Sequence, residues 1–157
     1  MSSVVKIISS GQTGAERAAL DWAIAHGVEH GGWCTKERRA EDGRIDERYR
    51  VSETPSSQPR QRTAWNVRDS DATVIFSVAK ELSAGSKLAL EVAGKLGKPC
   101  LHLYPGADVV TSLRDFLARY NVRILNVAGP RASRAPNIAR FVQAALSAGI
   151  PRAQERV

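Results

Sequence analysis

The chain has 157 residues, of which 43% are hydrophobic and 25% are charged. This balance is typical of one ordinary globular domain and excludes a disordered, collagen-like or coiled-coil chain. The formal net charge of +7 suggests a polyanionic partner, but residues 110–157 hold eight Arg against two acidic residues. We therefore expect most of this excess charge to cover a solvent or subunit face. Because no recognition helix or basic aromatic strand is present, we expect no nucleic-acid partner.

Hydrophobic periodicity predicts strands and helices that alternate along the chain. Short β-branched runs such as ATVIFSV are typical of buried strands, whereas apolar residues at helical spacing predict helices. In chain order, we predict a strand at residues 4–8, a helix at 16–26, a short strand at 31–34, a short helix within 60–71, a strand at 72–78, a helix at 86–96, a strand at 100–104, a helix at 113–120, a strand at 123–128 and a helix at 138–146.

This alternation predicts an α/β fold, because strands separated by helices of about 10–15 residues pair in parallel and carry helices on both faces. We expect one three-layer domain over residues 1–157, with 150–157 as a loose tail. Ligands of such sheets bind beyond the carboxyl ends of the strands. Polar, glycine-containing segments follow several of the predicted strands, and we therefore expect a composite ligand pocket at that edge of the sheet.

The lengths of the apolar segments and the positions of the cysteines predict where the protein is located and whether it binds a metal. No segment approaches the ~18 apolar residues that a membrane helix needs, and the first residues lack the core of a signal peptide. We therefore expect a cytoplasmic protein without a membrane partner. Cys34 and Cys100 lie far apart in apolar segments, so we expect both to be buried. With three His in the chain, we expect no metal site.

The first candidate binding segment, SGQTGAER at residues 10–17, joins the first strand to the first helix. Its glycines would let the backbone approach an anion at the start of that helix. No Lys follows the second glycine, so the segment is not a P-loop. Alternatively, Thr13 and Glu16 form a capping box that only starts the helix. The candidate binding residues here are Gly11, Gln12, Thr13, Gly14 and Arg17.

The second candidate segment lies at residues 31–44 and places an aromatic side chain beside several arginines. Such a surface suits a heterocycle that carries phosphate. A solvated loop with compensating charges would look similar, but long segments without periodicity, such as 35–57, are usually functional or disordered. The candidates here are Gly32, Trp33, Arg38, Arg39, Glu41 and Asp42.

Three further segments complete the predicted pocket. Arg62 and Asn66 lie four residues apart and would share one helix face with Thr63, an arrangement that suits a phosphate or a ribose. Alternatively, Asp69 and Asp71 only end that helix. Gly85 and Ser86 would form a second anion cradle at a helix start, unless Ser83 or Ser86 simply caps the helix. The last strand leads into a Gly-Pro-Arg turn, and this segment supplies the candidates Asn126 and Arg131.

Several of these segments together resemble the molybdenum carrier family, and the resemblance extends to about Gly149. That family is similar in fold to the Rossmann-like lysine-decarboxylase-like proteins, which include nucleotide phosphoribohydrolases. The segments that carry the resemblance are GQTG (11–14), GGWC (31–34), RAEDG (39–43), ET (53–54), RT (62–63), NVRDSD (66–71) and NVAGPR (126–131).

The resemblance implies a Rossmann-like homo-oligomer, a dimer or a tetramer, that binds molybdenum cofactor (molybdopterin), a pterin dithiolene with a phosphate. The phosphate would lie on residues 11–14 or on Gly85 and Ser86, and the pterin near Trp33. Arg38, Arg39 or Arg62 would neutralise its charge. The chain departs from the family pattern at Ser10, Glu16, Thr35, Glu37, Ala84, Lys87 and Ala89, and the changes around Gly85 weaken the case for phosphate contacts there.

Two other functions remain open beside a carrier without enzymatic activity. One is an enzyme that hydrolyses the N-glycosidic bond of a nucleotide, with Glu91 or Glu41 as the catalytic carboxylate and Arg39 or Arg62 as the phosphate clamp. The PGGxGTxxE motif of the phosphoribohydrolases is absent. The other is a sensor that binds a nucleotide or an ADP-ribose-type ligand without turnover.

Overall fold

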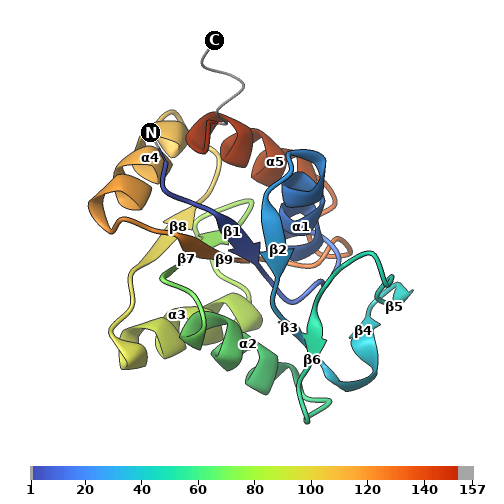
Figure 1. Cartoon of the computed structure of the whole chain (residues 1–157). Helices are drawn as coiled ribbons and strands as arrows, with labels where there is room; N and C mark the ends of the chain where they lie inside the picture. Colours follow the sequence, from blue (N-terminus) through green and yellow to red (C-terminus); the bar gives the residue numbers. More distant parts are fainter. Residues whose placement is uncertain (1, 152–157) are drawn as a thin grey trace.

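The computed structural model describes residues 2–151 and contains a five-stranded sheet in which all neighbouring strands run parallel. The order across the sheet is β2-β1-β9-β7-β8 (Figure 1). The strands are β1 (Lys6–Ile8), β2 (Glu29–Gly31), β7 (Ala72–Phe76), β8 (Cys100–Leu103) and β9 (Ile124–Ala128). The predicted α/β fold is therefore confirmed.

The last strand of the chain lies at the centre of this sheet. β9 pairs with β1 on one side and with β7 on the other. Asn126 is in register with Ile8 of β1 and with Thr73 of β7. The carboxyl ends of strands from the beginning, the middle and the end of the chain therefore meet at one edge.

Helices cover both faces of the sheet, as expected for parallel strands. On one face lie α1 (Ala15–Ala25), α4 (Val109–Arg119) and α5 (Ile138–Gly149); on the other lie α2 (Pro59–Arg68) and α3 (Ala84–Leu96) (Figure 1). Among the described residues, no helix combines the length and the apolar character needed to cross a bilayer.

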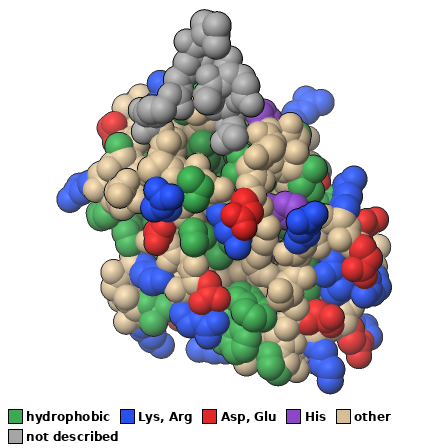
Figure 2. All heavy atoms as spheres, viewed as in Figure 1, with side chains coloured by type: hydrophobic (Ala, Val, Ile, Leu, Met, Phe, Trp, Pro, Cys, Tyr) green, Lys and Arg blue, Asp and Glu red, His purple; other side chains and the backbone are tan. Residues whose placement is uncertain are grey.

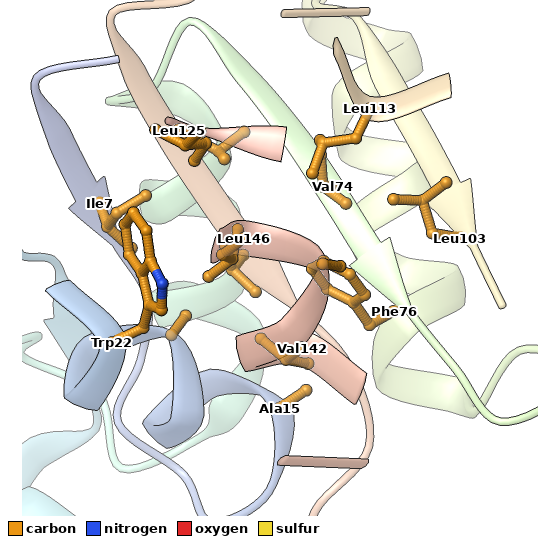
Figure 3. Close-up of a cluster of buried hydrophobic side chains, with 14 of the residues drawn as sticks. Ile7, Ala15, Trp22, Val74, Phe76, Leu103, Leu113, Leu125, Val142 and Leu146 are labelled. Atoms are coloured by element: carbon orange, nitrogen blue, oxygen red, sulfur yellow. The ribbon is translucent and has the colours of Figure 1, made fainter. Parts of the chain in front are cut away.

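The main hydrophobic core lies between the sheet and the α1, α4 and α5 layer (Figure 3). Side chains of β7 alternate between the two faces: Val74 and Phe76 belong to this core, whereas Ile75 packs on the α2 and α3 side. The Phe76 ring meets Phe141 of α5 edge-on, with 5.5 Å between centroids. Ile150 is also buried in this core, whereas most of the expected tail, residues 152–157, lies outside the described part of the chain.

Residues 33–56 form a small extension at the edge of the domain, which we call the β3–β6 lobe. It contains β3 (Trp33–Cys34), a 3₁₀ turn (Lys36–Arg38), β4 (Arg39–Ala40), β5 (Gly43–Arg44) and β6 (Ser52–Glu53). β3 pairs in parallel with β6, and β4 with β5 antiparallel. Ile45, Tyr49 and Val51 form a second hydrophobic cluster with Leu20 and Cys34. Acidic and basic side chains lie side by side over this region, at the right of Figure 2.

The single strand predicted at residues 31–34 is wrong, because the chain leaves the main sheet at Gly32. β2 ends at Gly31, and β3 pairs with the lobe instead. Gly32 has φ +124°, and a Cβ there would lie 2.2 Å from the Ser9 carbonyl oxygen. Only glycine fits this close approach. The GGWC segment is therefore a junction between the sheet and the lobe.

Candidate functional site

A pocket of about 410 Å³ lies at the carboxyl edge of the sheet, on the α2 and α3 side. Its floor includes Asn126 and Ala128 of β9, whose side chains point away from the main core because strand residues alternate in direction. Asn126 is only 3% exposed. Volumes of roughly 300–1,000 Å³ are typical of small-molecule sites, so this is the candidate functional site.

One wall of the pocket holds a largely buried ion pair. Glu16, in the first turn of α1, accepts hydrogen bonds at Oε1 from the Ser10 hydroxyl and from Nη1 of Arg62 in α2. The Arg62 contact is 3.3 Å long, and the two side chains are 11% (Arg62) and 14% (Glu16) exposed. The alternative interpretation, a capping box of Thr13 and Glu16, is wrong: Gly14 is the N-cap of α1, and no side chain of the described residues caps this helix.

The backbone of the glycine loop at residues 11–14 turns inward. The N–H of Ala15 donates to the Pro130 carbonyl, that of Arg17 to the Gln12 carbonyl, and that of Thr13 to Gln12 Oε1. A Cβ on Gly14, which has φ +84°, would lie 2.4 Å from the Pro130 oxygen. The loop therefore packs closely against the β9–α5 segment, and the amides of Thr13 and of the first residues of α1 that follow it are already used.

The start of α3 is the more open anion site. The Ser83 hydroxyl accepts from the N–H of Ser86, which confirms the capping interpretation of Ser83. The amides of Ala84 and Gly85 have no hydrogen-bond partner among residues 2–151, and both residues line the pocket. Free N–H groups and the helix dipole at this end favour a bound anion.

The β9–α5 segment adds positive charge at the mouth of the pocket. Arg131 and Arg134 both line it and are exposed. Within the described residues neither forms a salt bridge. With Arg62 and Glu16, the pocket thus has three guanidinium groups and one carboxylate, a net excess of two positive charges. Such a site suits an anionic group.

Eight of the residues predicted from sequence line this pocket, and they come from the glycine loop, α2, α3, β9 and the β9–α5 segment. Asn66 is one of them, but its side-chain amide also holds the lobe in place by pairing with both the N–H and the carbonyl of Trp33. The eight are Gln12, Arg62, Thr63, Asn66, Gly85, Ser86, Asn126 and Arg131.

The remaining ten predicted residues do not line the pocket, and most of them have structural contacts in or beside the lobe. Arg38 is buried, and its guanidinium donates to the carbonyls of Ile45, Asp46, Tyr49 and Val51. Arg39 is exposed and pairs with Glu37. The ten are Gly11, Thr13, Gly14, Gly32, Arg17, Trp33, Arg38, Arg39, Glu41 and Asp42.

Trp33, near which the pterin was expected, packs against α2 instead. Its ring meets that of Trp65 edge-on at 4.7 Å, and its Nε1–H donates to Asp69. Asp69 also ends α2, and Asp71 accepts from the amides of Arg123 and Ile124. Asp69 therefore has the helix-ending role weighed for it, whereas Asp71 joins the start of β7 to the start of β9.

Glu41 and Asp42 attach the lobe to the pocket's rim. Glu41 accepts from the N–H and hydroxyl of Ser133 and from Thr13, and these hydrogen bonds lower the pKa of its carboxyl group. Asp42 pairs with Arg17, which lowers the pKa of Asp42 in the same way. Glu41 thereby positions the segment that carries Arg131 and Arg134. Glu91 is exposed on α3 and does not line the pocket.

Sequence reasoning missed Arg134 and the pocket role of Glu16. Arg134 lies three residues after Arg131, close to the same Gly-Pro-Arg turn. This spacing could have indicated a second arginine at the pocket. Glu16 was assigned to a capping box, and its true partner, Arg62, is 46 residues away. No local pattern indicates such a contact.

Neither cysteine is placed for nucleophilic chemistry. Cys34 is fully buried and Cys100 half-buried, and burial raises the pKa of both thiols, that of Cys100 to about 11. The expectation of buried cysteines is confirmed for Cys34. Within residues 2–151, no three His, Cys, Asp or Glu side chains come together as metal ligands.

Comparisons with known proteins give one matching family and one similar solved structure. The model of the circularly permutated YpsA SLOG family matches residues 7–150. A crystal structure from Syntrophus aciditrophicus SB, named "Putative molybdenum carrier protein", shares 40% sequence identity. The alignment covers 95% of this chain and 96% of that one, with a TM-score of 0.90. No curated protein matches the sequence.

Proposed function

The chain belongs to the circularly permutated YpsA SLOG family, and from this premise we propose that its pocket binds a phosphorylated heterocycle, with molybdenum cofactor as the leading candidate. One observation carries the proposal. Two amides at the start of α3, which have no hydrogen-bond partner among the described residues, line the same pocket as Arg131 and Arg134. The name of the Syntrophus protein, a molybdenum carrier, supports a ligand that contains molybdenum.

The residues present fit the cofactor's phosphate. The amides of Ala84 and Gly85 and the hydroxyl of Ser86 would bind its oxygens, and Arg131 and Arg134 would neutralise its charge. The bound cofactor would supply a dithiolene that holds the metal, so the protein itself needs no cluster of metal ligands. The role of the chain's residues is to bind, orient and shield the ligand.

The positions of the carboxylates also favour a carrier over a glycosidase. Neither Glu91 nor Glu41 lines the pocket, and Glu16, which does, is already bound by Ser10 and Arg62. Incubation with nucleoside monophosphates tests the enzyme directly. Release of free base would replace the carrier proposal with the glycosidase.

The main test uses protein made in a host that synthesises molybdenum cofactor. After treatment with acid and iodine, the purified protein should release a fluorescent oxidised pterin. The double variant Arg131→Ala/Arg134→Ala should retain at least tenfold less, because it loses two charged contacts worth about 1 kcal/mol or more each.

The matched control is Arg119→Ala/Arg140→Ala, which removes the same charge from α4 and α5 outside the pocket. This variant should retain as much pterin as the parent. Equal losses in both double variants would show that net charge rather than the pocket holds the ligand, and absence of pterin from the parent protein would contradict the cofactor.

A further inference from the structure

We infer that the inner end of this pocket selects a ring with two adjacent N–H donors, the 2-amino-4-oxopyrimidine edge that pterins share with guanine, through Glu16 and Asn126. This inference rests on the proposed function and names the part of the heterocycle that is recognised. The pocket is asymmetric: two unpaired acceptor oxygens belong to its largely buried side chains Glu16 and Asn126, whereas exposed donors lie at its mouth.

Glu16 is the first of the inner acceptors. Among the described residues it is the one acid that lines the pocket, and its side chain is 14% exposed. Both of its hydrogen bonds, from Ser10 and Arg62, end at Oε1. Oε2 has no partner within residues 2–151. A carboxylate weakens a pure anion site, so its presence here favours a ligand with hydrogen-bond donors.

Asn126 is the second inner acceptor. Its side chain is 97% buried, and Nδ2 donates to the Thr73 hydroxyl at 3.1 Å. Asn126 lines the pocket, and its Oδ1 has no hydrogen-bond partner in the described part of the chain. A buried carbonyl left unpaired costs free energy comparable to a lost hydrogen bond. A donor on the ligand would satisfy it.

The mouth of the pocket has the opposite character. Arg131, Arg134 and the free amides of α3 are all donors. Phosphate oxygens can pair with this end but not with the free acceptor oxygens of Glu16 and Asn126. A phosphorylated ring with two adjacent N–H donors at its far edge satisfies both ends. An adenine-type ring presents one amino donor flanked by ring-nitrogen acceptors, so it cannot satisfy both acceptor oxygens.

Two pteridines that differ at one position test this inference. In 6-carboxylumazine a carbonyl replaces the 2-amino group of 6-carboxypterin, and both are fluorescent acids whose binding can be measured by titration. We expect the parent protein to bind 6-carboxypterin at least tenfold more tightly, because a carbonyl would face an acceptor. Inorganic phosphate, measured by competition, reports on the mouth alone.

Glu16→Gln places an amide donor where Oε2 was and retains an oxygen for Ser10. We expect this variant to lower the preference for 6-carboxypterin to below about threefold, while phosphate affinity does not fall below the parent value because a carboxylate has been removed from the anion site. The control is Glu91→Gln, which makes the same change on the exposed face of α3 and should keep the full preference. Thermal unfolding checks that both variants are folded.

Three other outcomes would contradict the inference or the proposed function. Equal binding of the two pteridines by the parent protein would overturn the inference without any variant. Equal weakening of both pteridines and of phosphate in Glu16→Gln would also overturn it, and would mean that Glu16 only orients Arg62. If the parent binds none of the three probes, the proposed function fails as well.

Discussion

Two neighbouring arginines, Arg38 and Arg39, show how residues that look alike in the sequence can have opposite roles. Arg38 is buried with φ +56° and binds four backbone carbonyls of its own lobe. The Arg39 side chain is 75% exposed, and within residues 2–151 it pairs only with Glu37. The first is part of the lobe's interior and the second belongs to its surface.

We predict that Arg38→Ala destabilises the protein by about 3 kcal/mol, because it leaves several buried carbonyls without donors. Arg39→Ala is the matched control and should cost less than about 0.5 kcal/mol, since exposed ion pairs contribute little. Chemical denaturation measures both values. Similar costs for the two variants would show that the Arg38 contacts do not hold the lobe.

At the scale of elements, α1 and α3 begin in different ways although both follow a strand at the pocket. The start of α1 is buried against the β9–α5 segment, whereas the first amides of α3 stay free. The end of α3 is also well defined: Gly97 adopts φ +66° as its C-cap. Capping contacts, rather than the helix sequence alone, decide which helix start can hold an anion.

Two glycines of α3 provide a matched test of its stability. Gly94 lies in the exposed helix interior with open space around its Cα, so Gly94→Ala should stabilise the protein by about 0.8 kcal/mol. Gly97 needs the left-handed conformation, so Gly97→Ala should destabilise it by about 1 kcal/mol. Melting temperatures compare the two, and shifts of the same sign would contradict this assignment of the helix end.

At the scale of the whole molecule, the net charge of +7 has little bearing on the pocket. Arg62, Arg131 and Arg134 line it, whereas Arg114 binds the Ala148 carbonyl between α4 and α5. Arg152 and Arg156, which were also expected on an outer face, lie outside the described residues. That the protein is cytoplasmic and a homo-oligomer remains a prediction. Sedimentation of the purified protein would test the oligomeric state.

Stability should decrease on both sides of neutral pH. Hydrogen bonds and arginines lower the pKa of Glu41, Asp42 and Asp69, and burial lowers the pKa of His30 and His102. The folded protein therefore binds fewer protons than the unfolded chain in acid. The contribution of the two histidines is lost as the pH falls below about 6.5, their ordinary pKa, and that of the carboxylates only as it falls below their ordinary values of 4.5 for Glu and 3.8 for Asp.

The cysteines limit the stability of the protein at high pH rather than at low pH, because burial raises the pKa of Cys34 and Cys100. Their contribution is present below the ordinary thiol value and is lost as the pH rises above about 9. Melting temperatures measured from pH 4 to 10 should show a plateau near pH 7–8.5 and a fall of about 5 °C or more by pH 4.5. A melting temperature that rises on acidification would contradict these shifts.

The sequence predicted the fold more completely than the site. Nearly every predicted strand and helix is present, because apolar periodicity is a local property that survives without tertiary contacts. The lobe was not predicted as structure, since its two-residue strands are too short to show a period. In the site, Arg62 and Asn126 were predicted because they lie on a helix face or at a strand end that faces the sheet's carboxyl edge.

The sequence by itself determined the α/β class, the parallel strands and the edge of the sheet at which polar loops gather, because each follows from spacing between near neighbours. Only the tertiary structure decided that β9 lies at the centre of the sheet, that Arg38 is bound within the lobe, and that Glu16 pairs with Arg62 in one wall of the pocket. These contacts join residues distant in the chain, and the charge or period of a short segment does not reveal which distant partner it will meet.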